Sequence, residues 1–154
     1  RVVAFGAGFV SRGDAAGTHG KELALWRAAG LSPEQLGSAY RAVGAGMGAT
    51  LRSAVEMDGY TLTDRASWLT FGVQDGHGIV VEGYPELFNQ YGVIALNPAR
   101  HPHVNRAGAS AFLAWILGPT GQRAIAAFRP GGTQLFFPNA GEDFATAVPG
   151  GRSE

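Results

Sequence analysis

The residues best suited to chemistry lie in one short polar segment, residues 11–19. An apolar run typical of a strand precedes this segment and a helical pattern follows it, which is where an α/β sheet places its ligand site. The first N–H groups of a helix have no partner inside it and the helix dipole adds positive potential, so small anions are favoured there. Arg12 can offer two parallel N–H donors to a tetrahedral oxyanion, the Thr18 hydroxyl can donate to another oxygen, and Gly17 lets a ligand approach the backbone. The segment therefore predicts half of an anion cage.

Asp14 lies in the same segment and needs a separate explanation. Its carboxylate would repel a dianion if it pointed inward, so we expect it to hold Arg12 in position or to cap the helix. The alternative is that Arg12 and Asp14 form a solvated surface pair and that Thr18 is a plain N-cap. Spacing alone leaves both interpretations open.

The composition excludes several other kinds of site. The chain has 154 residues, enough for one domain with a core, and its 12 basic residues balance its 12 acidic ones. A neutral chain has no overall field that attracts nucleic acid, so no nucleic-acid partner is expected. The sequence contains no cysteine, which excludes disulfides, thiolate metal sites and cysteine nucleophiles.

The beginning of the chain suggests that it is part of something longer. The chain opens in an apolar run at residues 1–5, with neither a methionine nor a signal segment, so we expect upstream sequence to be missing. No run approaches the roughly 18 apolar residues of a membrane span.

The elements that position the polar segment follow from periodicity and from helix and turn signals. Strands are predicted at residues 2–10, 60–62, 78–82, 93–96 and 135–138. Helices are predicted at residues 18–29, 32–36, 49–57, 66–69, 105–117 and 120–128. Because strands alternate with helices, the fold class is α/β.

The first helix is predicted to begin at a cap formed by Thr18 or Asp14 and to stop at Gly30. Its buried stripe is predicted to consist of Leu23, Leu25, Trp26 and Ala29. Elsewhere, buried helix positions are predicted for Trp68, Trp115, Ile125 and Phe128.

Competing signals are weaker. Gly6 and Gly8 after an apolar run imitate the start of a dinucleotide-binding fingerprint, but Ser11 replaces the third glycine and no acidic residue follows a second strand at the required distance. His101 and His103 lack a third ligand nearby, so no metal site is expected. No acid and base pair and no nucleophile elbow is recognisable, so we predict neither catalytic residues nor a cofactor.

Ordered motifs resemble the tungstate-binding proteins of ABC transport. They are FVSRGD at 9–14, GTH at 17–19, KE at 21–22, LW at 25–26, GMG at 46–48, TL at 50–51, YTLTDR at 60–65, NQYGVI at 89–94, NP at 97–98 and Trp115. The resemblance covers residues 9–138. It implies a two-lobed periplasmic binding protein of the second topological type, which is not an enzyme. Such a protein captures tungstate or molybdate outside the cytoplasm, either in the periplasm or as an extracellular membrane-associated protein, and passes it to an ABC transporter permease.

The resemblance also assigns residues. The ligand-binding positions that it implies are Ser11, Arg12, Ala16, Gly17, Thr18 and Tyr60. Asp14 and His19 would hold these residues in position without contacting the ligand themselves. Ala16 would contribute only its backbone N–H, because the family usually has Asp-Ser where this chain has Ala15-Ala16. Losing a serine hydroxyl bond to a charged group weakens binding by about 1.5 to 3 kcal/mol.

The family's amino-terminal lobe, with its Thr- and Ser-rich oxyanion motif, is absent from this sequence. We therefore expect an incomplete fold in which residues 1–92 form the oxyanion-binding lobe and residues 93–154 return toward the other lobe. An apolar face left uncovered in this way predicts a homo-oligomer. Two other functions remain open: a non-transport domain that reuses the fold with a degraded anion site, and an NAD-dependent oxidoreductase.

Overall fold

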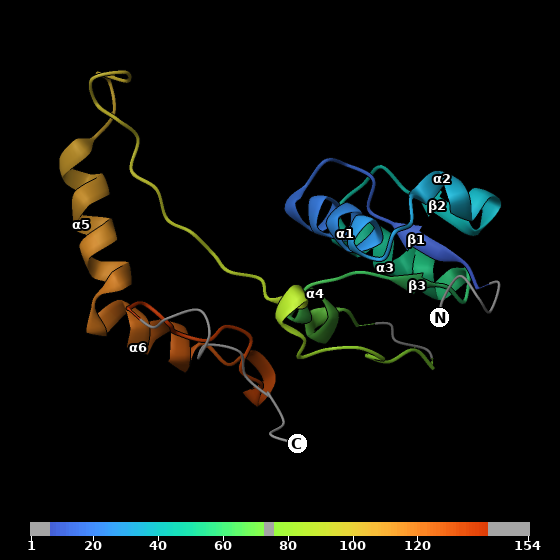
Figure 1. Ribbon diagram of the computed structural model, residues 1–154. Coiled ribbons are helices and arrows are strands. Elements are labelled where there is room, and N and C mark those ends of the chain that lie inside the picture. The colour runs from blue at the N-terminus through green and yellow to red at the C-terminus, as the bar shows by residue number, and fades with distance from the viewer. Residues whose placement is uncertain (1–6, 73–75, 142–154) are drawn as a thin grey trace. The chain divides into compact units, whose positions relative to one another are not determined.

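The computed structural model describes residues 7–72 and 76–141. The chain divides into two compact units, residues 1–81 and 82–154. Figure 1 shows that the strands belong to the first unit, whereas α5 and α6 belong to the second. Each unit is described separately below.

The first unit contains a three-stranded parallel sheet in the order β2-β1-β3. Its strands are β1 (Phe9–Ser11), β2 (Tyr40–Ala42) and β3 (Tyr60–Thr61). In the register of the sheet, Phe9 pairs with Tyr40 and with Tyr60. Because all three strands run the same way, the segments that follow them leave from one edge of the sheet. We call this edge the carboxyl edge.

Helices connect the strands in the order that an α/β class requires. The helix α1 (Gly17–Ala28) follows β1, α3 (Met47–Glu56) follows β2, and α4 (Arg65–Thr70) follows β3. The short α2 (Pro33–Leu36) and η2 (Gly37–Ala39) lead into β2. The chain moves outward from β1 to β2 and back across β1 to β3, so right-handed connections place α1 and α3 on opposite faces of the sheet.

The core of this unit lies between α3 and α4. Met47, Leu51 and Trp68 form a buried cluster, against which Leu69 and Phe71 pack. Trp68 is therefore a core residue, as the sequence predicts. Asp64 caps α4, since its carboxylate accepts a hydrogen bond from the Ser67 N–H at 2.8 Å.

The helix α1 differs from its prediction in how it is buried. Its buried residue is Glu22, while the predicted stripe is half-buried at best and Ala29 is exposed. Neither Thr18 nor Asp14 caps the helix, because the chain enters it through Ala16, one residue earlier than predicted. The predicted stop is confirmed: Gly30 has a φ of 70°, which glycine adopts without strain.

The second unit contains two helices that pack on each other, α5 (Arg106–Leu117) and α6 (Pro119–Ala127). Asn105 caps α5 by accepting from the Gly108 N–H at 2.8 Å. A side chain at Gly121 would collide with the backbone of α5, so glycine permits the close crossing of the helices. Two single turns, η3 (Pro85–Leu87) and η4 (Pro130–Gly132), flank this helix pair in the sequence.

Three predicted strands do not form. Residues 78–82, 93–96 and 135–138 are not paired in any ladder of the described chain, although they are rich in apolar side chains. A strand needs a neighbouring strand for its N–H and C=O groups, and these segments form no ladder with any other described residue. The predicted strand at 2–10 forms only at Phe9–Ser11, and residues 1–6 lie outside the described residues.

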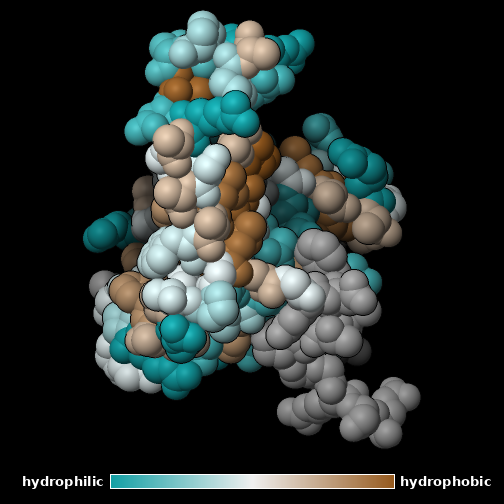
Figure 2. All heavy atoms as spheres, turned by 90° about the vertical axis from the view of Figure 1, so that its left-hand side faces the viewer, coloured by the Kyte–Doolittle hydropathy of each residue, from teal (hydrophilic) through white to brown (hydrophobic). Residues whose placement is uncertain are grey.

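The second unit also leaves apolar side chains exposed, and Figure 2 shows apolar surface on the face that carries α5. Trp115 is 44% exposed and Phe128 is 54% exposed, so the predicted burial of both is wrong. Among the described residues, the most exposed large apolar side chain of the unit is that of Ile94, at 88%. The Phe128 ring lies 6.3 Å from that of Phe136 and Leu135 is buried, but among the described residues the unit has no buried cluster like the one between α3 and α4.

Candidate functional site

The candidate site lies at the carboxyl edge, where the segment after β1 meets the segment after β2. The Val43 N–H donates to the Ser11 carbonyl and the Gly44 N–H donates to the Arg12 carbonyl, both at 2.9 Å. These bonds continue the parallel pairing beyond the strands. They bring the loop that contains Arg12 beside the loop that leads into α3.

The loop after β1 turns sharply at Gly13, which has a φ of 63°. A Cβ at this position would lie 2.8 Å from the Ala42 Cβ and 3.4 Å from the Gly44 nitrogen. Ala15 also has a positive φ, 59°, which costs energy for a residue with a side chain. The corner between β1 and α1 is therefore tight and depends on glycine at one position.

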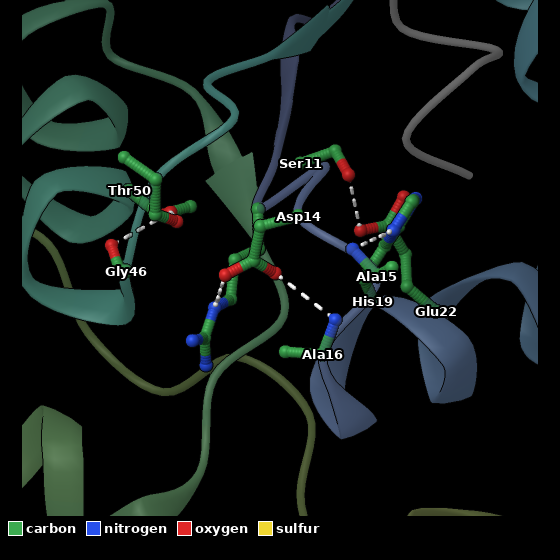
Figure 3. A network of polar contacts seen from close by, with 10 residues as sticks. Ser11, Asp14, Ala15, Ala16, His19, Glu22, Gly46 and Thr50 are labelled. Carbon is green, nitrogen blue, oxygen red and sulfur yellow. Dashed lines mark hydrogen bonds and ion pairs between the residues drawn. The ribbon is translucent and has the colours of Figure 1, made fainter.

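Arg12 and Asp14 form an ion pair across this corner. The Arg12 Nε donates to the Asp14 Oδ2 at 2.8 Å, while the Asp14 Oδ1 accepts from the Ala16 N–H at 3.2 Å (Figure 3). Burial alone would raise the pKa of Asp14, but the bonds from Ala16 and Arg12 outweigh it and lower that pKa below its usual value. Both carboxylate oxygens are therefore occupied, as a supporting residue requires.

The two Nη atoms of Arg12 are available to a ligand. Among the described residues, Asp14 is the hydrogen-bond partner of this guanidinium, and it uses only the Nε. The Arg12 side chain is 25% exposed, so it is accessible without being fully solvated. A guanidinium in this state can donate two parallel bonds to an oxyanion.

The helix amino termini at this edge carry bare amides. No side chain caps α1 or α3, whose N-cap residues are Ala16 and Gly46. The first amides of each helix have no intrahelical acceptor, so in α1 the N–H groups of Gly17 and Thr18 are available to a ligand. The Ala16 N–H, in contrast, already donates to Asp14, so it does not offer the free ligand donor that the sequence predicts.

His19 lies in the first turn of α1 and supports the corner. Its Nδ1 accepts a hydrogen bond from the Ala15 N–H at 3.2 Å (Figure 3). An acceptor at Nδ1 requires that this nitrogen carry no proton. The bond stabilises the positive φ of Ala15, so His19 contributes to the shape of the loop.

Ser11 is placed differently from what its predicted binding role requires. It is fully buried, and its hydroxyl donates to the Glu22 Oε2 at 2.7 Å, pointing toward α1 (Figure 3). A hydroxyl has a single proton, so Ser11 has no donor left for an oxyanion. Thr18 is half-buried, and none of the described residues accepts a hydrogen bond from its hydroxyl. This hydroxyl can therefore still donate to a ligand.

Tyr60 is not brought together with the other candidates. It pairs with Phe9 at the amino end of the sheet, two positions before the level of Ser11. At about 3.3 Å of rise per residue, its backbone lies roughly 7 Å before the level of Ser11 along the strand direction, so it is not at the carboxyl edge. The residues that follow β3 at the carboxyl edge are Leu62 and Thr63.

Sequence reasoning missed Glu22 and Thr50. Glu22 is buried, and Thr50, fully buried in α3, donates to the Gly46 carbonyl at 3.2 Å, which stabilises the first turn of that helix. A charged residue on the face shared with Trp26, four positions away, is a signal for Glu22 that the sequence contains. Thr50 gave no such signal.

The described residues contain no group of three or more His, Asp or Glu side chains that could hold a metal ion. The rings of His101 and His103 lie edge to face, with centroids 6.2 Å apart, on an exposed segment. Within the part of the chain that the structure describes, no helix is both long and apolar enough to cross a membrane.

Comparison with known proteins places this geometry in a family. A family profile described as a PBP superfamily domain matches residues 6–120. The tungstate-binding protein TupA of Peptoclostridium acidaminophilum is 46% identical over 134 residues, which cover 86% of this chain and 46% of that protein. A putative ABC transporter anion-binding protein of Haloferax volcanii is 44% identical over 142 residues, covering 88% of this chain and 40% of its own length. The chain thus spans less than half the length of these curated relatives.

Solved structures agree with the sequence relatives. The tungstate-binding protein TupA from Desulfovibrio alaskensis G20 is similar with a TM-score of 0.75 and 42% identity, over 90% of this chain and 57% of that one. The tungstate ABC transporter structure from Geobacter sulfurreducens is similar with a TM-score of 0.63 and 38% identity, over 79% of this chain and 51% of that one. The predicted α/β class and the predicted family are therefore confirmed: the chain belongs to the PBP superfamily and, within it, to the tungstate-binding periplasmic protein family.

Proposed function

We propose that this chain is the anion-binding part of an extracytoplasmic solute-binding protein that captures tungstate or molybdate for an ABC importer. The names of its relatives support an anion-binding transport role. The single observation that carries the proposal is the placement of Arg12, which is held by Asp14 through its Nε and presents both Nη atoms beside an uncapped helix terminus.

The donors suit a tetrahedral dianion. The Arg12 guanidinium supplies positive charge and two parallel donors, and the N–H groups of Gly17 and Thr18 add donors with a favourable helix dipole. The Thr18 hydroxyl can reach a further oxygen. Asp14 does not oppose binding, because both of its oxygens face their own donors.

Capture requires a second set of donors from the opposing side of the ligand, which belongs to the remainder of the binding protein in this proposal. Closure over the ion would expel water and strengthen each charge-assisted bond. No chemical step is involved, since the residues bind the anion and release it unchanged to a permease. No cofactor is needed.

Arg12→Ala tests the proposal. Isothermal titration of tungstate and molybdate into the protein expressed from its complete reading frame is expected to show binding. Loss of a charged donor pair costs about 1.5 to 3 kcal/mol, so Kd should rise by roughly 10- to 150-fold in the variant. Arg27→Ala, at the far end of α1, is the matched control and should leave Kd unchanged.

The result that contradicts the proposal is an absence of heat with any tetrahedral oxyanion from a folded wild-type protein. That outcome would favour a domain that reuses the fold with a degraded anion site. The replacement of the family's Asp-Ser by Ala15-Ala16 is the feature that would then explain the loss.

A further inference from the structure

Glu22 is a buried carboxylate, 3% exposed, that the proposed anion cage does not contain. Its Oε2 accepts from the Ser11 hydroxyl at 2.7 Å, and its Oε1 accepts from the Tyr40 hydroxyl at 2.8 Å and from the Trp26 Nε1–H at 3.2 Å. Among the described residues, no cationic side chain forms an ion pair with it. Three uncharged donors therefore hold this carboxylate.

The donors join three parts of the first unit. Ser11 is the last residue of β1, Tyr40 is the first residue of β2, and Trp26 lies one turn further along α1. The Phe9 ring reinforces the same contacts, edge-on to Trp26 at 5.0 Å and stacked on Tyr40 at 6.1 Å. The group made of Ser11, Glu22, Trp26 and Tyr40 is called the Glu22 cluster below.

The Glu22 cluster is important because few other buried contacts hold α1 on the sheet. Glu22 is the buried residue of this helix, and the apolar residues around it are only half-buried. Apolar contacts are non-directional, whereas hydrogen bonds fix both distance and angle. The orientation of α1 on the sheet is therefore set by a directional polar group.

That orientation determines where the donors of the anion cage point. The loop from Arg12 to Ala16 spans the gap between Ser11 and the start of α1, so the cluster fixes both ends of this loop. A small rotation of α1 would move the amides of Gly17 and Thr18 away from the Arg12 guanidinium. Effective binding requires these donors to converge on one ion.

We propose that Glu22 is a positioning residue for the oxyanion site: the Ser11, Tyr40 and Trp26 donors lock α1 to the sheet and thereby aim the helix amides and Arg12 at one ligand. This inference rests on the proposed function. It reassigns Ser11 from the ligand to the lock, since its only proton is directed at Glu22.

Two substitutions of Glu22 separate positioning from simple packing. In Glu22→Gln, the amide oxygen can replace Oε1, which accepts from Tyr40 and Trp26, and the amide nitrogen can donate to the Ser11 oxygen. Glu22→Leu has a similar volume and keeps a packed helix, but it cannot make a directional bond. Glu56→Gln, at an exposed position of α3, is the matched control.

Titration calorimetry with tungstate on the full protein tests the proposal. Glu22→Leu is expected to stay folded and to raise Kd at least tenfold, whereas Glu22→Gln should stay within threefold of wild type and Glu56→Gln should be unchanged. A folded Glu22→Leu variant with wild-type Kd overturns the positioning role and leaves the proposed function intact. A folded wild-type protein that binds neither tungstate nor molybdate contradicts both the proposed function and the positioning role.

A spectroscopic signature checks the lock directly. The Trp26 indole N–H signal in a ¹H–¹⁵N spectrum, assigned with Trp26→Phe, should shift upfield in Glu22→Leu and stay near its wild-type position in Glu22→Gln. If Glu22→Leu does not fold, Tyr40→Phe replaces it, because that variant keeps the ring contact with Phe9 and loses one donor. Tyr40→Phe should raise Kd threefold or more, and an unchanged Kd would overturn the inference.

Discussion

Asp14 accepts hydrogen bonds with both carboxylate oxygens, from Arg12 and from the Ala16 N–H. These bonds lower its pKa below 3.8, the ordinary value that it has in the unfolded chain. A carboxyl group with a lowered folded pKa stabilises the native state fully above the unfolded value, and it loses that contribution as pH falls through the folded value. The corner should therefore be insensitive to pH between about 5 and 7 as far as Asp14 is concerned.

The prediction is that acid below pH 3.8 loosens the corner. Thermal unfolding of wild type and of Asp14→Asn should be followed over pH 2 to 6. The gap between their midpoint temperatures should close as the pH falls, because the Asp14 carboxylate becomes protonated whereas the asparagine does not titrate. A gap that stays constant over this range would show that Asp14 is not paired in solution.

Replacing Ser11 is predicted to lower the free energy of unfolding, apart from any effect on ligand binding. Ser11→Ala leaves the buried Glu22 carboxylate with one donor fewer. An unmade bond to a buried charged group costs about 1 to 3 kcal/mol of unfolding free energy, measurable by urea denaturation. Ser53→Ala, in α3, is the control and should change that free energy by no more than about 0.5 kcal/mol. Equal effects of the two substitutions would contradict the assigned bond.

At the scale of elements, local signals place the ends of several helices. Asp64 precedes α4 and Asn105 precedes α5, and each accepts from an amide in the first turn of its helix. Such caps involve residues within three positions of each other, so they are visible in sequence. The start of α1 lacks this signal, since the methyl side chain of Ala16 cannot accept a hydrogen bond from the first amides of the helix.

Alanine substitutions at two glycines, one in the corner before α1 and one within α1, should change the free energy of unfolding in opposite directions. Gly13→Ala should lower the unfolding free energy by about 1 to 2 kcal/mol, because its φ is positive and the added Cβ would lie 2.8 Å from that of Ala42. Gly20→Ala, within α1 and with open space around it, should raise that free energy by about 0.4 to 1 kcal/mol. Denaturant titration of both variants measures the difference. A Gly13→Ala protein as stable as wild type would mean that the turn relaxes.

At the scale of the whole molecule, the two units differ in how well they cover their apolar residues. The first has a buried cluster at α3 and α4, whereas the second leaves Phe112 52% exposed and Ile94 88% exposed. Exposed apolar surface of this kind promotes association. The chain also spans less than half the length of its curated relatives, so a large part of their fold has no counterpart in it.

We therefore predict that the 154-residue chain self-associates in solution. Light scattering coupled to gel filtration should give a mass above 16.0 kDa that increases with concentration. Phe112→Arg, on α5, should lower the associated fraction, while Arg123→Ala, on α6, serves as a control that leaves the apolar face intact. A monomer at all concentrations would contradict this prediction.

The sequence by itself predicted the α/β class, the corner after β1 and the approximate extents of α4 and α5, and it offered support of Arg12 as one of the possible roles of Asp14. These features depend on residues a few positions apart, whose interactions the chain order reveals directly. The motifs around residues 9–14 and 60–65 also identified the family, which the comparisons confirmed.

Only the tertiary structure decided the burial of Glu22, the direction of the Ser11 proton, the pairing of β2, and the distance of Tyr60 from the corner. It also showed that residues 78–82 and 93–96 join no sheet in the described part of the chain. The physical reason is common to all of these. Each depends on a partner that lies far away in the sequence, or on one that the described chain does not supply, and a local pattern of residue types contains no information about that partner.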